Sequence, residues 1–249
     1  MVGQAGWRRV GPDPAIAAWA DAARPLAVAA LASSPEPLRC AGTWAVGLDL
    51  LANDETGALD GTAFPWKALP LQPEPLHKGQ LSAVYPGYPQ PGLEESAAAA
   101  RYRVTRDAAH LDGLLPVGAA RARMMQEPHG WILGLPLTDC APGAAPLVVW
   151  EGSHTVMRAA LAAALQPHPV DDWAQVDLTA PYQAARLQVF QTCRRVEVPA
   201  RPGEATLLHR MLLHGVAPWQ RGATAPAEGR IIAYFRPLLP SVQAWLDAD

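Results

Sequence analysis

Short apolar runs separated by turn residues make up most of the chain after residue 40. The runs are rich in Val, Ile, Leu, Tyr and Trp, and Pro, Gly, Asp or Asn lie between them. Many short strands with frequent turn signals predict an all-β barrel or sandwich and disfavour alternating strands and helices. The predicted strands lie at residues 41–50, 80–85, 101–110, 131–137, 146–150, 194–200, 204–209 and 230–235.

Apolar residues at helical intervals interrupt this pattern. Residues 13–32 are Ala-rich and predict one or two helices with a break near Pro25, because a proline inside a helix removes a hydrogen bond. Helical insertions are predicted near 153–165, with Ser153 as the N-cap, and near 180–193, with Thr179 as the candidate cap. The fold class is therefore an all-β core with flanking helices.

The chain shows no internal repeat and no linker, so we expect a single domain over residues 1–249. Residues 1–40 are expected to form an N-terminal helical segment that packs on the β core of residues 41–238. The segments 85–100 and 113–130 are predicted to be long loops near the mouth of a barrel, where lids and binding loops are common.

Composition narrows the class of protein. A net charge of -3 argues against a nucleic-acid-binding protein or one that binds anionic membranes. Three scattered Cys without a C-x-x-C spacing exclude a Cys-based zinc module and fit a reducing compartment. Pro and Asp punctuate the N-terminal residues, and no run reaches the length of a membrane span. We therefore expect a cytoplasmic protein that binds neither nucleic acid nor membranes, and leave its oligomeric state open.

His110-Leu111-Asp112 is the first chemical signal. On a strand, His110 and Asp112 project to the same side, because side chains alternate between the two faces. An imidazole and a carboxylate are two of the three ligands of a facial 2-His-1-carboxylate site, which holds non-haem Fe(II) and leaves positions open. The alternative is a surface pair where a strand meets a loop, since so short a motif also arises by chance.

A late histidine must complete such a site, and His209 and His214 compete for the role. They are five positions apart, so on an unbroken strand they would face opposite sides. We favour His214 because Gly215 follows it and lets the backbone approach a bound ion closely. His209 and His154 are then expected to be structural.

Arginine on the last predicted strand offers a site for an anion. Arg230 opens residues 230–235, and its planar guanidinium suits the far carboxylate of a dianionic co-substrate. Arg236 has the same strand parity and is the rival.

These motifs, in this order, resemble the phytanoyl-CoA dioxygenase (PhyH-like) family. The resemblance covers roughly residues 80–237 and rests on H-x-D (110–112), PLVVWEGSH (146–154), RPGEATLLHRMLLHGVAP (201–218) and GRIIAYFRP (229–237). Family members carry P-G-S-H where this chain has Glu151-Gly152-Ser153-His154, and G-D where it has Gly203-Glu204. The stretch 135–138 is largely apolar where the family has further co-substrate contacts.

The resemblance implies a double-stranded β-helix (jelly roll, cupin-like) and an Fe(II)- and 2-oxoglutarate-dependent dioxygenase. It implies His110, Asp112 and His214 as iron ligands and Arg230 as the 2-oxoglutarate anchor, with no catalytic residue beyond the metal ligands. O2 and 2-oxoglutarate would be consumed, and succinate and CO2 released as a small molecule is hydroxylated. The alternatives are a jelly-roll protein that binds a metal or ligand without 2-oxoglutarate turnover, and a cupin-type metalloenzyme that does not use 2-oxoglutarate.

Overall fold

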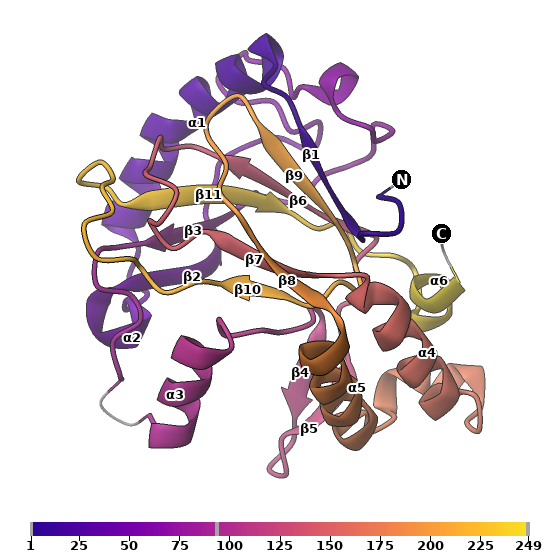
Figure 1. The fold of residues 1–249 in the computed structure, drawn as a ribbon. Coiled ribbons are helices and arrows are strands. Elements are labelled where there is room, and N and C mark those ends of the chain that lie inside the picture. The colour runs from indigo at the N-terminus through magenta and orange to yellow at the C-terminus, as the bar shows by residue number, and fades with distance from the viewer. Residues whose placement is uncertain (1, 93–94, 248–249) are drawn as a thin grey trace.

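The apolar runs become strands of two antiparallel sheets with helices around them (Figure 1). The computed structural model describes residues 2–92 and 95–247. The larger sheet has the order β1-β9-β6-β11-β3-β2 and the smaller one β10-β7-β8. The strands are β1 (Trp7–Val10), β2 (Trp44–Asp49), β3 (Gln80–Val84), β6 (Trp131–Pro136), β7 (Leu147–Glu151), β8 (Arg194–Val198), β9 (Ala205–His209), β10 (His214–Val216) and β11 (Arg230–Phe235). The predicted class, an all-β core with flanking helices, is confirmed, and the sheets are antiparallel.

The two sheets pack face to face. Ile132 of β6 and Leu208 of β9 share a buried cluster with Leu147 and Val149 of β7 and Val198 of β8. Side chains that alternate along each strand can bury one face in this layer and present the other to helices. The inner faces of the two sheets therefore form the layer in which a site between them can lie.

Helix α1 (Pro14–Ser33) covers the outer face of the larger sheet (Figure 1). The Asp13 carboxylate caps it by accepting hydrogen bonds from the backbone N–H groups of Ala15 and Ile16. Trp19, which is fully buried, packs edge-on against Phe235 of β11 at a ring separation of 5.8 Å. This contact ties the helix to the central strand of the sheet.

The break that was expected near Pro25 is absent. The helix runs without a break through Pro25, which is exposed, so the carbonyl that loses its backbone partner lies where water can serve it. The expectation that no run reaches the length of a membrane span is also wrong, because α1 is long and apolar enough to span a membrane by length and composition alone. Its buried stripe packs into the core with the sheet. Before it, β1 pairs with β9, so the segment 1–40 begins as a strand.

The predicted strand 101–110 is instead helix α3 (Ala97–Thr105) followed by a turn. Ser96 caps it by accepting from the N–H of Ala99, and the Ala run after the cap favours helix over strand. The predicted loop 113–130 is also wrong, because it contains a hairpin of β4 (Leu114–Val117) and β5 (Ala122–Met125).

The remaining helices lie at the edges of the sheets. Both α4 (Ser153–Leu165) and α5 (Thr179–Thr192) occupy the ranges predicted for insertions, to within a residue, and they pack on one another. Gly152, with a φ of 78°, is the N-cap of α4, so Ser153 does not have the expected capping role. The short elements are α2 (Arg39–Gly42), η1 (Trp66–Ala68), η2 (Val170–Gln175) and α6 (Val242–Asp247).

Replacing Trp19 with Ala should lower the free energy of unfolding by about 3–5 kcal/mol, because it empties the contact between α1 and β11. Urea denaturation measures this loss. Leu187→Ala, at a side chain that is 62% exposed, is the matched control and should stay within about 0.5 kcal/mol of the wild type. A loss at Trp19 no larger than the control's would show that α1 is not packed on the sheet.

Candidate metal centre

His110, Asp112 and His214 come together although a hundred residues separate the pair from the last of them. One ligand atom from each lies within 4.8 Å of the others. Within the described parts of the chain, they are the only group of three or more His, Cys, Asp or Glu side chains that could hold a metal ion in this way. The sequence therefore named three side chains that the fold does bring to one point.

A two-stranded backbone contact sets the two imidazoles side by side. His110 and His214 form an isolated antiparallel bridge, in which the N–H of His110 donates to the His214 carbonyl at 2.8 Å and the reverse bond is 3.2 Å. Directly opposed residues carry their side chains on the same face. The ring centroids are consequently 4.5 Å apart.

Asp112 closes the triangle from the same side. Its Oδ1 lies 3.2 Å from Nε2 of His110 and 3.6 Å from Nε2 of His214. The Asp112 and His214 side chains are buried, whereas that of His110 is 46% exposed, so the centre is open on the His110 side. The three ligand atoms line a cavity of about 200 Å³, with Ile132, Leu147 and Val216 among its apolar walls.

Each imidazole presents the nitrogen that a metal needs. Nδ1 of His110 lies 3.0 Å from the carbonyl of Ala108, and Nδ1 of His214 lies 2.9 Å from the carbonyl of Leu212. A carbonyl can only accept, so each Nδ1 carries a proton, and in the neutral form of each ring Nε2 is the nitrogen that keeps its lone pair. Backbone carbonyls fix metal-binding histidines in proteins in the same way.

The electrostatics of His214 and Asp112 also suit a cation, whereas at His110 the hydrogen bond and charge of Asp112 outweigh burial and raise the pKa of the imidazole. Burial lowers the pKa of His214 to about 4, so its imidazole is neutral at pH 7. Burial alone would raise the pKa of Asp112, but the charge of Arg236 and the neighbouring imidazoles outweigh it and hold that pKa well below its usual range. A neutral imidazole beside an ionised carboxylate is the protonation state that metal binding requires.

The turn before His110 shows why the chain folds this way here. Asp107 and Ala108 both have a φ of 53°, so H-x-D follows a tight turn. The expectation that it lies at the end of the strand 101–110 is wrong. A Cβ on Gly215 would lie 2.1 Å from the Asp107 carbonyl oxygen, so only glycine fits. Gly215 thus admits the neighbouring backbone, and the reason given for it from the sequence, an approach to the ion, is replaced.

Two polar contacts secure this region from outside the centre. The Arg195 guanidinium donates to both carboxylate oxygens of Asp107, at 2.7 and 2.8 Å. The Ser153 hydroxyl oxygen, from the first turn of α4, accepts from the N–H of Leu213 at 2.9 Å. These residues were missed as supports of the site, because only the fold places them beside residues 107 and 214.

His209 lies elsewhere. It ends β9 of the larger sheet, whereas His214 begins β10 of the smaller one, so the chain changes sheets between them. The His209 ring packs against that of His154 at 4.8 Å, and its Nδ1 accepts from the N–H of Met211 at 3.0 Å. The strand-parity argument assumed an unbroken strand, which the structure does not have, but its conclusion that the two histidines do not share one site agrees with the structure.

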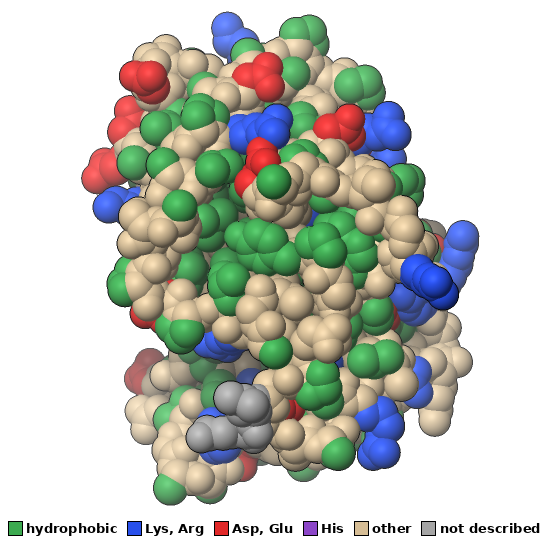
Figure 2. All heavy atoms as spheres, turned by 90° about the vertical axis from the view of Figure 1, so that its left-hand side faces the viewer, with side chains coloured by type: hydrophobic (Ala, Val, Ile, Leu, Met, Phe, Trp, Pro, Cys, Tyr) green, Lys and Arg blue, Asp and Glu red, His purple; other side chains and the backbone are tan. Residues whose placement is uncertain are grey.

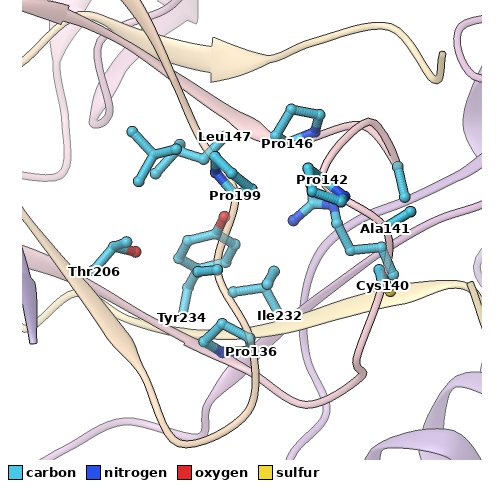
Figure 3. A pocket seen from close by; sticks show the side chains of 14 residues that line it. Pro136, Cys140, Ala141, Pro142, Pro146, Leu147, Pro199, Thr206, Ile232 and Tyr234 are labelled. Atoms are coloured by element: carbon cyan, nitrogen blue, oxygen red, sulfur yellow. The ribbon is translucent and has the colours of Figure 1, made fainter. Parts of the chain in front are cut away.

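Arg230 and Arg236 lie on the same face of β11 and its extension, about 20 Å apart along the strand direction. Arg230 is buried under the loop of residues 140–146, and within the described residues its Nε has no hydrogen-bond partner. Its narrow cavity shares Leu147 and Tyr234 with the metal cavity (Figure 3). Arg236 instead contacts the centre itself, because its Nη1 donates to Oδ2 of Asp112 at 2.6 Å.

Tyr234 and Gln80 are site residues that the sequence reasoning missed. Tyr234 lies on β11 between the two arginines, and Gln80 is its register partner on β3. Burial raises the pKa of Tyr234, and Arg230 opposes this through its charge and a hydrogen bond. Strand parity with Arg230 could have indicated Tyr234. None of the described residues of the segment 85–100, expected to cover the site, lines the metal cavity.

The face of the molecule turned toward the viewer in Figure 2 has hydrophobic side chains gathered at its centre, with most of the charged side chains around them.

The cavity beside the Arg230 guanidinium is lined by the apolar residues Pro142, Ala144 and Pro146. A charge in such surroundings needs a partner of opposite charge, which makes this end of the cavity a place for an anion.

No protein-family profile and no curated protein sequence matches the chain. Among solved structures, AviO1 from Streptomyces viridochromogenes Tue57 is 15% identical, with 96% of this chain and 93% of that chain covered and a TM-score of 0.41. The non-heme alpha ketoglutarate dependent carbocyclase SnoK from nogalamycin biosynthesis is 14% identical, with 97% and 85% covered and a TM-score of 0.41. Similarity at this level does not establish a shared fold, so the chemistry of the site rests on its geometry.

His209 should make the stability of the protein depend on pH. Burial lowers its pKa in the folded state to about 3, whereas the unfolded chain has the ordinary value near 6.5. The unfolded state therefore binds more protons between these values, and stability is fully present above pH 6.5 and lost as pH falls toward 3. Urea denaturation at pH 7 and pH 4.5 should show a smaller loss for His209→Asn than for the wild type. The exposed His168→Asn should lose as much as the wild type, and equal losses for all three proteins would contradict the prediction.

Proposed function

We propose that the protein is an Fe(II)- and 2-oxoglutarate-dependent oxygenase of the PhyH-like kind that oxidises a small molecule. The observation that carries this is the meeting of the H-x-D pair with His214, with both Nδ1 atoms committed to backbone carbonyls. Three donors on one side of an open cavity form a facial site with free coordination positions, the arrangement typical of non-haem Fe(II) oxygenases.

The proposal includes a double-stranded β-helix, and the order of the strands supports it. Going along the chain, β3 lies in the larger sheet, the His110 bridge joins the smaller one, and β6 lies in the larger sheet again. Next, β7 and β8 lie in the smaller sheet, β9 in the larger, β10 in the smaller and β11 in the larger. Repeated crossing between two facing antiparallel sheets is what a jelly roll requires.

Arg230 would hold the far carboxylate of 2-oxoglutarate. Its guanidinium is buried and hydrogen-bonds with Tyr234, and its cavity shares the lining residues Leu147 and Tyr234 with the metal cavity. A dianion with one end at the ion and the other at Arg230 would supply the acceptor that the buried Nε lacks within the described structure. When bound, iron and 2-oxoglutarate supply the oxidising chemistry, with O2 consumed and succinate and CO2 released.

The protein fixes the ligand side chains in place and lines the cavity beside them with apolar residues. The backbone bridge fixes both imidazoles, and the Asp112 carboxylate faces them from one side. Ile132, Leu147 and Val216 give the cavity apolar walls beside the three ligand side chains. A larger cavity of about 830 Å³ lies beyond Arg236 and Gln80, which line both spaces, and is large enough for a small-molecule substrate.

His110→Ala and His214→Ala should each weaken Mn(II) or Fe(II) binding by more than about 100-fold, beyond what is usual for residues that only support ligands. Isothermal titration under anaerobic conditions measures the affinity, and circular dichroism checks that the fold is retained. The exposed His168→Ala is the matched control and should bind as the wild type does. Unchanged affinity in both variants at the centre would refute the metal assignment.

Arg230→Ala should weaken 2-oxoglutarate binding by about 100-fold while metal affinity stays within about 2-fold, because a charge-assisted bidentate pair is lost far from the ion. In the wild type, anaerobic addition of Fe(II) and 2-oxoglutarate should give a weak visible charge-transfer band, and its titration gives the affinity. Arg221→Ala, at an exposed arginine, is the control. A metal-binding protein without 2-oxoglutarate turnover would show no band and would tolerate the loss of Arg230.

A further inference from the structure

Arg236 has a contact with the metal centre that the proposed function does not use. Its Nη1 donates to Oδ2 of Asp112 at 2.6 Å, and both side chains are largely buried, at 17% and 7% exposed. The other oxygen of Asp112, Oδ1, is the one that faces the two imidazoles, at 3.2 and 3.6 Å. The two carboxylate oxygens thus have separate partners.

The separate partners of the two Asp112 oxygens show that Arg236 does not occupy the place of the metal ion. A cation that merely replaced the metal would lie on Oδ1, between the two Nε2 atoms. Arg236 takes the oxygen on the opposite side and leaves Oδ1 free for the space that the imidazoles share. A carboxylate can accept on both oxygens at once, so the guanidinium and an ion do not compete.

Arg236 is itself fixed from two directions. Its Nη2 donates to Oε1 of Gln80 on β3, and its backbone N–H donates to Nε2 of His77 at 2.7 Å. Gln80 also lines the metal cavity. The guanidinium therefore reaches Asp112 from a braced position, and a flexible surface arginine would not hold the carboxylate in one orientation.

We propose that Arg236 is a positioning residue of the metal centre, which turns Asp112 so that Oδ1 faces the two imidazoles, with Gln80 bracing the guanidinium. The inference rests on the proposed function, because the ion is the one assigned there. Hydrogen-bond partners of metal ligands typically contribute 10–100-fold to metal affinity. Arg236 would thus act on the ion only through Asp112.

Mn(II) titration of the purified protein, followed by calorimetry and by electron paramagnetic resonance, tests this without turnover. Arg236→Leu should weaken Mn(II) binding by about 10–100-fold and broaden the distribution of Mn(II) signals. Arg236→Lys keeps the positive charge but lacks the planar guanidinium with its two terminal N–H groups. Its Mn(II) affinity should therefore fall less, by about 3–10-fold. Gln80→Leu should lie between Arg236→Lys and the wild type, and Arg8→Leu, at an exposed arginine of β1, should bind as the wild type does.

A double-mutant cycle separates positioning from general stabilisation. In an Asp112→Asn background, Arg236→Leu should change Mn(II) affinity by less than about 2-fold, because the contact through which it acts is already altered. An equal loss in both backgrounds would overturn the proposal. Should Arg236→Leu fail to fold, Arg236→Lys and Gln80→Leu decide, and unchanged affinity in both would overturn it too.

The outcomes also separate this inference from the proposed function. If the wild-type protein binds no Mn(II) at the His110, Asp112 and His214 side chains, both the proposed function and the role of Arg236 are refuted. A wild type that binds Mn(II) and shows the 2-oxoglutarate band, with Arg236→Leu equal to it in affinity, ends only the role of Arg236.

Discussion

The centre depends on a pair of backbone hydrogen bonds between residues 110 and 214. This bridge is where a turn after α3 meets the start of β10, and it places two imidazoles from distant parts of the chain 4.5 Å apart. It requires Gly215, since a side chain there would collide with the Asp107 carbonyl oxygen. A side chain at that one position would therefore separate the two halves of the site.

Charge balance is the second constraint. Asp112 is a buried carboxylate, and burying it without a partner would cost several kcal/mol. Arg236 supplies a positive charge on one oxygen, and the imidazoles face the other. The same arrangement that keeps the folded protein stable without an ion leaves one oxygen facing the space between the histidines. One oxygen of this side chain thus serves the charge balance of the fold, and the other faces the proposed metal site.

β11 connects the centre to the rest of the fold. One face of the strand carries Ile231, Ala233 and Phe235 into the core beneath α1, and the other carries Ile232 and Tyr234 toward the smaller sheet. Arg230 and Arg236 lie at the two ends of this inner face. The strand that carries both arginines is therefore packed against α1 through its opposite face, and no residue of α1 lines either cavity.

Short apolar runs bounded by turn residues were sufficient to locate most strands, as at 80–85, 131–137 and 230–235, where both faces of the strand are largely buried. They failed at 101–110, where the helix propensity of an Ala run and the Ser96 cap outweigh a pattern that also suits a strand. The H-x-D spacing, the glycine after His214 and the resemblance to a known family together named the three side chains that meet. Spacing also indicated Arg230, whose role stays a prediction.

The sequence by itself determined which residue types stand at which intervals, and so the all-β class with flanking helices and the histidines and carboxylate available to a metal. Only the tertiary structure decided that Arg236 supports Asp112, that Gly215 admits a neighbouring backbone, and that Ser153 and Asp107 secure the bridge. These roles arise from contacts between segments far apart in the chain. Local patterns of hydrophobicity do not encode such contacts, because they depend on how the two sheets pack.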